Sequence, residues 1–367
     1  RNISCHRCNF VAEYFLFIIR KQRDPSMFLG DDERKGERGN RPLVWYMRQA
    51  GRVLPNYMKL REKYSFEELM HNPKLAADVT LLPVSDLGVD AAIVFSDILS
   101  VPTALGMDLE WTDHGPRFKK PLCEEKDPHK ILHPDLSKLS HVYEALDIVK
   151  ERSQVPTIGF CGAPLTTLCY MLQGVSGRQE FPDARKFFYE RPQETRYCID
   201  LLTEFSIEHA LRQIDHGIDA FQLFDTHAGV IPQTLYEELF LPAVKRFATA
   251  VRKRNIPFIY FPKGIGAGLS LMTPDVCDYV SVDWQTPLST ARRLVHPEVR
   301  LQGNIDPYLL LTTQERIVGA MKSIYVPFFK EHRGRWILNL GHGVLANTPF
   351  DNLRFLTEWI KDEDNWK

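Results

Sequence analysis

The sequence predicts an α/β fold, a single (β/α)8 TIM-type barrel. Eight short apolar runs rich in Val, Ile, Phe and Leu recur along the chain, and each ends in a polar or Gly-containing loop. The runs are nearly continuous and do not alternate with polar residues, which is typical of parallel strands covered on both faces. Segments with helical periodicity separate them. The predicted strands are Pro42–Tyr46, Asp90–Phe95, Thr157–Phe160, Ala220–Phe224, Pro257–Phe261, Tyr279–Val282, Val299–Gln302 and Trp336–Leu340.

Regular alternation of strand and helix implies βαβ units with right-handed crossovers, and eight such units close naturally into a barrel. An open doubly wound sheet is the competing fold. Its first strand is commonly followed by a Gly-x-Gly-x-x-Gly turn, whereas Met47–Arg52 (MRQAGR) stands at that place in this chain. The barrel is therefore the favoured prediction.

Two of the intervening segments carry recognisable helix ends. Gln193–His216 has apolar residues near helical spacing and is followed by Gly217, the residue type favoured just past a helix C-terminus. Thr286 and Pro287 predict the start of another helix, with Thr at the N-cap and Pro at the first helical position.

Composition and charge exclude several function classes. The 367 residues include 46 Lys and Arg against 47 Asp and Glu, which gives a formal net charge of −1. Because a general nucleic-acid binder usually carries a basic stripe, no nucleic-acid partner is expected. No apolar run approaches the roughly 20 residues of a membrane helix, so no membrane partner is expected either. The modest count of 7 Cys favours a reduced, cytoplasmic setting.

The barrel domain is expected to span residues 41–367, after an N-terminal extension of residues 1–40. Cys5 and Cys8 form a lone C-x-x-C pair in this extension, which has too few partners for a four-ligand zinc site. Phe10–Ile19 is apolar but is followed by basic residues where a secretion signal would have small ones. We therefore expect a surface segment and no working signal.

Active-site residues of a (β/α)8 barrel follow the strands, so the residues after each run are the candidates. Arg48 and Arg52 follow the first run, and they would share one face if this loop enters a helix. Guanidinium groups suit carboxylates or phosphates, which they can hold through two hydrogen bonds. A solvated pair of Arg at the start of a helix is the alternative interpretation.

Asp97 follows the second run and is flanked by apolar residues in Phe95–Leu99 (FSDIL). An N-cap Asp that accepts hydrogen bonds from helix amides is one interpretation. The other is a carboxylate in an apolar mouth, where low dielectric strengthens its attraction for cations and N–H groups.

Three further candidates follow later runs. Tyr170 lies on the helix expected after Gly159–Pro164 (GFCGAP), so its hydroxyl can point back toward the mouth, although a structural Tyr is equally open. Thr226 offers a hydroxyl after the fourth run, or a cap for the next helix. His342 stands between two Gly after the eighth run, where a ligand-binding and a structural role are both possible.

Together these residues suggest a barrel mouth with two Arg, one Asp, a Tyr, a Thr and a His. Lys263 and Gln302–Asn304 at other strand ends are weaker signals. No defensible Ser-His-Asp order, no P-loop and no H-E-x-x-H motif is found. The set suits a polyanionic ligand with a central group that an Asp can receive.

The motifs that carry these residues closely resemble those of the uroporphyrinogen decarboxylase family. The resemblance covers roughly Arg41 to the C-terminus, and the motifs fall in family order. The family fold is a (β/α)8 barrel, in agreement with the eight apolar runs. The motifs are MRQAGRVLP at 47–55, FSDIL at 95–99, GFCGAP at 159–164, QLFDTHAG at 222–229, LQGNIDP at 301–307 and NLGHGV at 339–344.

The resemblance implies a carboxy-lyase that removes CO2 from the four acetate side chains of uroporphyrinogen III and yields coproporphyrinogen III, on the route to haem and chlorophyll. It implies that neither a metal nor an organic cofactor is needed and that the protein is a homodimer. The substrate-binding residues implied by motif are Arg48, Gln49, Ala50, Gly51, Arg52, Asp97, Tyr170, Thr226 and His342. The catalytic residues implied are Asp97, Arg48, Arg52 and His342.

This substrate fits the predicted mouth. Its carboxylates can pair with Arg48, Arg52 and His342. Its pyrrole N–H groups can point at Asp97, which would also stabilise a pyrrole that has been protonated at a ring carbon. The cationic ring then acts as the electron sink, so the substrate supplies what a cofactor would otherwise supply. The acid that protonates the ring is one of Arg48, Arg52 and His342.

The chain departs from the family pattern at two of these motifs. Val53 stands where the family usually has Tyr, and Leu165 stands where it commonly has Trp. The first change removes a hydroxyl contact and the second a packing residue. Neither removes a proposed catalytic group.

Two other functions are the alternatives. Corrinoid-dependent methyltransferases of the same superfamily use zinc-bound thiolates, and they need a His-x-Cys pair with a distant Cys at strand ends. A non-catalytic tetrapyrrole-binding protein should have lost Asp97 or the Arg pair, and both are kept. The Cys residues that offer no such zinc pattern are Cys161, Cys169, Cys198 and Cys277.

Overall fold

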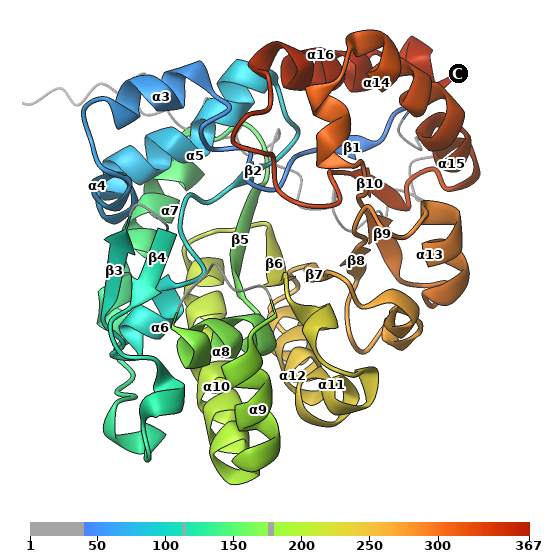
Figure 1. The fold of residues 1–367 in the computed structure, drawn as a ribbon. Coiled ribbons are helices and arrows are strands. Elements are labelled where there is room, and N and C mark those ends of the chain that lie inside the picture. Colours follow the sequence, from blue (N-terminus) through green and yellow to red (C-terminus); the bar gives the residue numbers. More distant parts are fainter. Residues whose placement is uncertain (1–39, 113–114, 175–179) are drawn as a thin grey trace, which may run out of the picture.

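In the computed structural model, which describes residues 40–112, 115–174 and 180–367, eight parallel strands form one sheet (Figure 1). Their order across the sheet is β1-β10-β9-β8-β7-β6-β5-β2. Each strand overlaps one of the eight apolar runs, so the predicted strands are confirmed. They are β1 (Leu43–Val44), β2 (Ala92–Ile93), β5 (Thr157–Gly162), β6 (Ala220–Asp225), β7 (Phe258–Pro262), β8 (Tyr279–Ser281), β9 (Arg300–Gln302) and β10 (Trp336–Leu338).

The first and last strands of this order, β1 and β2, are joined around Asp90. The Asp90 N–H donates to the Val44 carbonyl oxygen (2.8 Å), and the Asp90 carboxylate accepts from the Val44 N–H (2.9 Å). The Gln49 side-chain amide donates to the Ala91 carbonyl oxygen (2.9 Å). These bonds bring the two edges of the sheet together, so the strands follow one another around a ring, as the predicted TIM-type barrel requires.

Apolar side chains lie on both sides of the ring, which explains the continuous apolar runs. Along β7, Phe258 and Tyr260 belong to a large cluster that includes helix residues. The residues between and after them, Ile259 and Phe261, belong to a second cluster formed mainly by residues of the other strands. Neighbouring residues of a strand point to opposite faces, so each strand must be apolar throughout.

Helices connect successive strands and surround the sheet (Figure 1). The α-helices are α3 (Pro55–Arg61), α4 (Phe66–His71), α5 (Pro73–Leu87), α6 (Ser100–Ala104), α7 (Ser140–Arg152), α8 (Pro164–Gln173), α9 (Pro182–Glu190), α10 (Pro192–Asp215), α11 (Gln233–Leu239), α12 (Leu241–Arg252), α13 (Leu288–Leu294), α14 (Gln314–Ala320), α15 (Val326–Glu331) and α16 (Phe350–Lys361). The shorter helical turns are η2 (Leu122–Glu124), η3 (Pro128–Lys130), η4 (Leu136–Leu139), η5 (Ala228–Val230), η6 (Gly266–Leu271), η7 (Pro307–Leu311), η8 (Met321–Tyr325) and η9 (Glu363–Trp366).

One of the two helix-end predictions is confirmed and the other is wrong. The helix predicted at 193–216 is α10, and Gly217 follows it at a φ of 89°. The N-cap predicted at Thr286 is not formed, because Pro287 has backbone angles of −55° and 138° and the helix α13 begins only at Leu288. The Thr286 carbonyl oxygen instead accepts a hydrogen bond from the Asn304 side-chain amide (2.6 Å).

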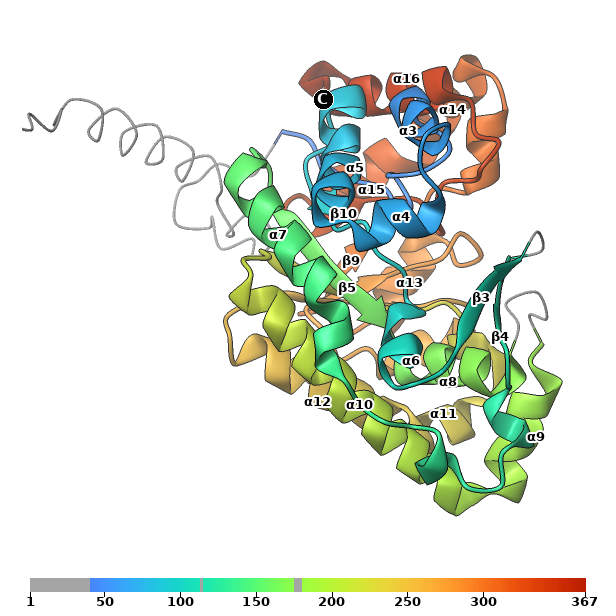
Figure 2. The same ribbon diagram turned by 90° about the vertical axis from the view of Figure 1, so that its left-hand side faces the viewer.

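A β-hairpin that the sequence did not predict lies beside α6, apart from the barrel sheet (Figure 2). Its strands are β3 (Leu109–Thr112) and β4 (Gly115–Phe118), which pair antiparallel. Gly and Pro in β4 weaken its strand signal in the sequence. The Phe118 N–H donates to the carbonyl oxygen of Gly174 (2.8 Å), which ties the hairpin to the end of α8.

The predictions for the N-terminal extension, including those for Cys5, Cys8 and Phe10–Ile19, lie outside the described residues. The domain boundary at residue 41 stays a prediction. Within the described part of the chain, no helix combines the length and the apolar character that crossing a membrane would need.

Candidate active site

Five of the six candidates lie around one end of the barrel, the end at which (β/α)8 enzymes hold their active sites, and Arg52 belongs to the same loop as Arg48. Arg48 follows β1, Asp97 follows β2, Tyr170 lies on α8 after β5, Thr226 follows β6 and His342 follows β10. The charge of Arg48 acts on the pKa values of Asp97, Tyr170 and His342, so it is close to all three. The fold therefore brings together groups that lie far apart in the sequence.

The segment from Arg48 to Arg52 is a loop and not the start of a helix. The first helix after β1, α3, begins at Pro55. Arg48 has a φ of 60°, which lies outside the right-handed helical region. The prediction that the two Arg share one helix face is therefore wrong, although both side chains are exposed, as a ligand-binding role requires.

Gln49 fixes the shape of this loop. Its side chain is fully buried, accepts from the Tyr46 N–H (3.0 Å) and donates to the Ala91 carbonyl oxygen. Its amide is therefore used within the protein, and its effect on a ligand runs through the position of the neighbouring Arg. Ala50 packs against the core, and the Gly51 carbonyl oxygen accepts from the N–H of residue 54 (2.9 Å).

The Arg48 side chain passes across the loop that follows β10. A Cβ atom on Gly343 would lie 2.4 Å from Cδ of Arg48, so only glycine leaves room for this arrangement. The Val344 N–H donates to the Met47 carbonyl oxygen (2.8 Å), which ties the two loops together. The Arg48 guanidinium is thereby held near His342.

Asp97 is anchored just before α6. One carboxylate oxygen accepts from the Leu99 N–H (2.7 Å), so the capping interpretation is right in part, although the N-cap residue is Leu99 itself. Burial raises the pKa of Asp97, while the Leu99 N–H and the Arg48 charge oppose the rise. Asp97 also lines a crevice of about 90 Å³, together with His71 and His141.

Tyr170 is hydrogen-bonded to His227, with 2.9 Å between its hydroxyl oxygen and the ring Nε2. Burial raises the pKa of Tyr170 to about 12 and lowers the pKa of His227 to about 4, with Lys263 adding to the second effect. Both side chains are therefore neutral near pH 7. Sequence analysis missed His227, although it directly follows Thr226 at a strand end, which was the signal available.

Thr226 lies half-buried at the end of β6. The capping alternative for Thr226 is wrong, because the N-cap of η5 is His227 and the N-cap of α11 is Pro232. Its hydroxyl is thus not committed to a helix end.

The buried carboxylate of Asp225 holds the loop that carries Thr226 and His227. Asp225 accepts from the Thr166 hydroxyl (2.6 Å), the Thr166 N–H (3.2 Å) and the Tyr260 hydroxyl (2.7 Å). The Thr166 hydroxyl oxygen also accepts from the His227 N–H (3.0 Å). Burial raises the pKa of Asp225, and the hydrogen bonds from Thr166 and Tyr260 oppose that rise.

His342 lies between two aromatic rings, with centroid distances of 6.5 Å to Phe261 and 6.1 Å to Trp284. Burial lowers the pKa of His342 to about 3, and the charges of Arg48 and Lys263 contribute to the decrease. The ring is therefore neutral near pH 7 in the free protein, and it offers a carboxylate a hydrogen bond where sequence analysis expected charge pairing. Lys263, a weak signal in the sequence, holds its Nζ atom 5.5 Å from the centroid of the Trp284 ring.

The two departures from the family pattern are both core positions. Val53 is 6% exposed and Leu165 is fully buried. An apolar side chain is compatible with burial at each place, and a Tyr hydroxyl is absent at Val53.

The cysteines that a zinc-dependent methyl transfer would need are buried thiols. Burial raises their pKa values, which disfavours the thiolate that binds zinc. Among the residues that the structure describes, no three His, Cys, Asp or Glu side chains group so as to hold a metal ion. The thiols are Cys161, Cys169, Cys198 and Cys277.

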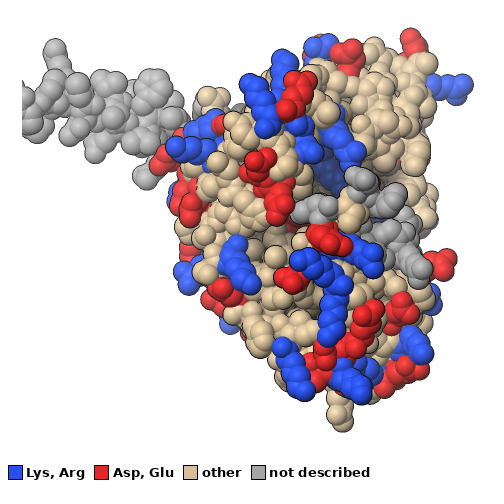
Figure 3. All heavy atoms as spheres, turned by 60° about the vertical axis from the view of Figure 1, so that its left-hand side comes forward, with Lys and Arg blue, Asp and Glu red and all other residues tan. Residues whose placement is uncertain are grey.

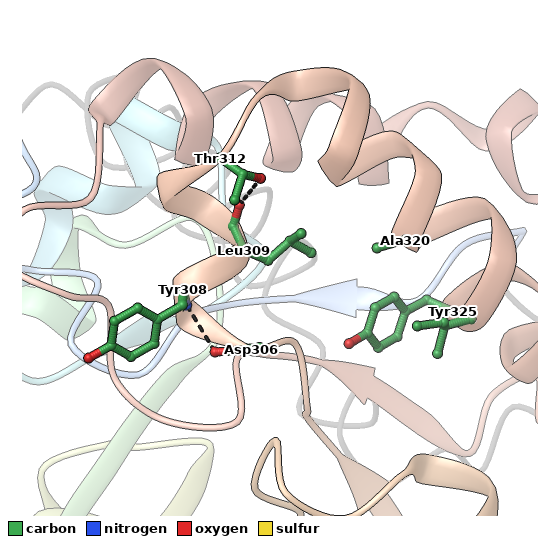
Figure 4. Close-up of a pocket in the computed structure, with 7 residues that line it drawn as sticks. Asp306, Tyr308, Leu309, Thr312, Ala320 and Tyr325 are labelled. Carbon is green, nitrogen blue, oxygen red and sulfur yellow. Dashed lines mark hydrogen bonds between the residues drawn. The ribbon is translucent and has the colours of Figure 1, made fainter.

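Figure 3 shows a recess in one face of the molecule in which Lys or Arg atoms are visible. A separate pocket of about 400 Å³ lies at η7 and η8, and Figure 4 shows its lining, which includes Asp306, Tyr308 and Tyr325. None of the predicted site residues lines that pocket.

Comparison with known proteins relates most of the chain to one family. The profile of the family described as uroporphyrinogen decarboxylase (URO-D) matches residues 34–363. The chain is 36% identical over 332 residues to a uroporphyrinogen decarboxylase of Christiangramia forsetii, covering 89% of this chain and 96% of the relative. It is 37% identical over 330 residues to that of Geobacter metallireducens, covering 89% and 95%.

Among solved structures, a methyltransferase from Methanosarcina mazei is similar in fold. It superposes with a TM-score of 0.73 at 19% sequence identity, covering 92% of this chain and 96% of that one. At this identity the likeness concerns the fold alone.

Proposed function

We propose that Asp97, Arg48, Arg52 and His342 carry out, in this chain, the reaction of the family to which the chain belongs, the uroporphyrinogen decarboxylases. The chain is a carboxy-lyase of tetrapyrrole biosynthesis. It removes CO2 from the four acetate side chains of uroporphyrinogen III and yields coproporphyrinogen III. The observation that carries the assignment of residues is a group of cations without carboxylate partners near one partly buried carboxylate.

The charge balance of the site suits this substrate. Among the described residues, neither Arg48 nor Arg52 forms an ion pair with a carboxylate. Uroporphyrinogen carries four acetate and four propionate carboxylates, which supply the missing anions. A charge-assisted hydrogen bond to each contributes roughly 1.5–3 kcal/mol. Neutral His342 and Tyr170 add hydrogen bonds without further positive charge.

Asp97 receives the centre of the substrate. The pyrrole N–H groups of the non-aromatic macrocycle can point inward at the carboxylate oxygen that the Leu99 N–H leaves available. Burial, which raises the pKa of free Asp97, also weakens screening by water, so these N–H groups stabilise its ionised form strongly. When a pyrrole carbon is protonated, the ring becomes cationic, and the charge of Asp97 stabilises it.

Each decarboxylation consumes one proton. Protonation of a pyrrole ring carbon makes the electron sink, the carboxylate leaves as CO2, and its bonding electrons neutralise the ring. The new exocyclic methylene then takes a proton while the ring carbon returns its own, which leaves a methyl group. Net, an acetate and a proton become a methyl group and CO2.

Arg48 is the best placed of the three candidate acids. His342 is neutral near pH 7, because burial and nearby cations lower its pKa to about 3. The charge of Arg52 acts on Tyr57, whereas that of Arg48 acts on Asp97 and Tyr170. A guanidinium is a poor acid in water, with a pKa above about 12, so Asp97 must lower the free energy of the cationic ring for the transfer to proceed.

The family resemblance also suggests a homodimer that works in the cytoplasm, and we include both in the proposal. Sedimentation equilibrium of the purified chain tests the first. A monomer at micromolar concentration would remove it.

The reaction is tested by anaerobic incubation with chemically reduced uroporphyrinogen. Products are oxidised and separated by carboxylate number, with and without a chelator. Species with seven to four carboxylates in both samples are expected. Tight tetrapyrrole binding with no loss of carboxylates would indicate a binding protein, and neither binding nor turnover would favour the methyl-transfer branch of the superfamily.

A further inference from the structure

We infer that Lys263 binds a carboxylate at the rim of the substrate, on a pyrrole ring other than the one that reacts, and that it acts as an anchor that takes no part in the chemical step. The inference rests on the proposed function, which supplies a ligand with many carboxylates. It adds a specificity-determining residue to the site. Lys263 lies outside the family motifs and is only a weaker strand-end signal in the sequence, so the inference stands on its place in the barrel and its contacts.

The order of the strands places Lys263 across the site from Arg48. The ring runs β1-β2-β5-β6-β7-β8-β9-β10, because the β1 and β2 edges are joined around Asp90. Lys263 follows β7, which is four strands from β1 in either direction and three strands from β2. The backbone positions of Arg48 and Lys263 therefore lie on opposite sides of the ring.

The contacts of Lys263 fix its ammonium group on the side of the site that holds His342. Its Nζ atom lies 5.5 Å from the centroid of the Trp284 ring, and that ring lies 6.1 Å from the ring of His342. Its own N–H donates to the Asp225 carbonyl oxygen (3.1 Å), and its carbonyl oxygen accepts from the Gly229 N–H (3.1 Å). The backbone is thus held by the β6 loop, and the ring of Trp284 supports the cation.

Lys263 has no carboxylate partner among the described residues, although it is half-buried. The Asp283 carboxylate, which accepts from the Gly264 N–H (2.6 Å) and the Gln285 N–H (2.9 Å), forms no ion pair with it. Its charge also lowers the pKa values of both His227 and His342, which places it near both rings. A half-buried cation beside two neutral imidazoles is a site for an anion.

The position of Lys263 in the ring of strands decides what kind of role this is. It follows β7, three strand positions from β2, the strand that precedes Asp97. A carboxylate bound at Lys263 belongs to a pyrrole ring that keeps this charge while another ring reacts. Its interaction is the same in the ground state and in the transition state, so it contributes to substrate binding and leaves the chemical step unchanged.

The test is Lys263→Met, which removes the charge and keeps an apolar stem against Trp284. We expect KM for uroporphyrinogen to rise about tenfold while kcat stays within about twofold. Lys263→Arg should restore most of the affinity. Lys322→Met is the matched control, because Lys322 is an exposed lysine of η8 outside the predicted site and its loss changes net charge equally.

Two measurements that need no turnover separate this inference from the proposed function. The first is the Kd for uroporphyrin, an octacarboxylate, measured by quenching of its fluorescence, which should rise about tenfold in Lys263→Met and not in the control. The second is NMR titration of the imidazoles, in which the pKa values of His227 and His342 should both rise when the neighbouring cation is removed. If wild type binds uroporphyrin without decarboxylating uroporphyrinogen, the proposed function fails while these two results still decide the role of Lys263.

Three outcomes would overturn the inference. An unchanged Kd and KM in Lys263→Met would mean that no carboxylate is bound there. A kcat that falls as much as KM rises would place Lys263 in the chemical step. Unchanged pKa values of the two imidazoles would mean that the ammonium lies elsewhere.

Discussion

Replacing Asp97 with Asn removes one charge and almost nothing else. The Asn side-chain oxygen can still accept from the Leu99 N–H, the bond that anchors Asp97 at 2.7 Å, so the turn before α6 should persist. The volume of the side chain is nearly unchanged. What is lost is the negative charge that, in the proposed mechanism, faces the cationic pyrrole.

The size of the loss follows from the position of the carboxylate. Two unit charges about 4 Å apart attract with about 4 kcal/mol at an effective dielectric constant of about 20, which corresponds to roughly a thousandfold in rate. Arg48 is near enough to act on the pKa of Asp97 and therefore offsets part of that attraction. We expect turnover to fall by at least about a hundredfold, as when one oxyanion-hole donor is removed.

Stability should change in the opposite sense. Burial raises the pKa of Asp97 in the folded protein, so ionising this carboxyl costs more free energy in the folded protein than in the unfolded chain. At pH 7 the ionised group therefore lowers the free energy of unfolding, and Asp97→Asn should leave the melting temperature equal or higher. A gain in stability with a loss of activity is typical of a residue kept for function.

The assay is the anaerobic decarboxylation described above, followed by separation of porphyrins by carboxylate number, with thermal melting of the same samples. Asp108→Asn is a control on another Asp, which is exposed and lies before the β3 strand. Turnover by Asp97→Asn within tenfold of wild type would show that Asp97 is a structural cap. A large fall in melting temperature would show that its carboxylate is needed by the fold, and the loss of activity would then say little about catalysis.

Two other outcomes are expected from the titrating groups. The His342 imidazole of the free protein should titrate near pH 3 by NMR. Its pKa should rise when uroporphyrin binds, because the carboxylates of the ligand offset the nearby cations. A titration near pH 6.5 in the free protein would contradict the burial of His342. Tyr260→Phe should lower the free energy of unfolding in urea by about 1.5–3 kcal/mol, because the buried Asp225 carboxylate loses a hydrogen-bond donor at 2.7 Å. An unchanged urea midpoint would show that this hydrogen bond is dispensable.

The strands were predictable because a barrel buries both faces of each one. Residues such as Ile259 and Tyr260, on opposite sides of β7, are both fully buried. The strand therefore appears in the sequence as an apolar run, which can be recognised without knowing which strands lie beside it. The end of α10 was predictable for a similar reason, since Gly217 adopts a left-handed conformation that glycine favours. Signals of this kind are local.

The errors concern loops whose shape depends on distant partners. The conformation of Arg48 is set by the buried amide of Gln49 and by room that Gly343 leaves from the other end of the chain. Nothing in Met47–Arg52 alone distinguishes this loop from a helix start. Sequence analysis missed His227 and gave Lys263 little weight because what marks them is their surroundings. His227 is hydrogen-bonded to Tyr170, and Lys263 has no carboxylate partner in the part of the chain that the structure describes.

The positive charges of the free site are arranged unfavourably. Arg48 and Lys263 both disfavour protonation of His342, and no described carboxylate forms an ion pair with either cation. A bound polyanion relieves this repulsion, so part of the binding free energy comes from the unfavourable state of the free site. Each decarboxylation then removes one carboxylate from the ligand and restores part of the repulsion. Affinity should therefore decrease from the octacarboxylate to the tetracarboxylate, which favours release of the final product over release of intermediates and follows from the charge of the site alone.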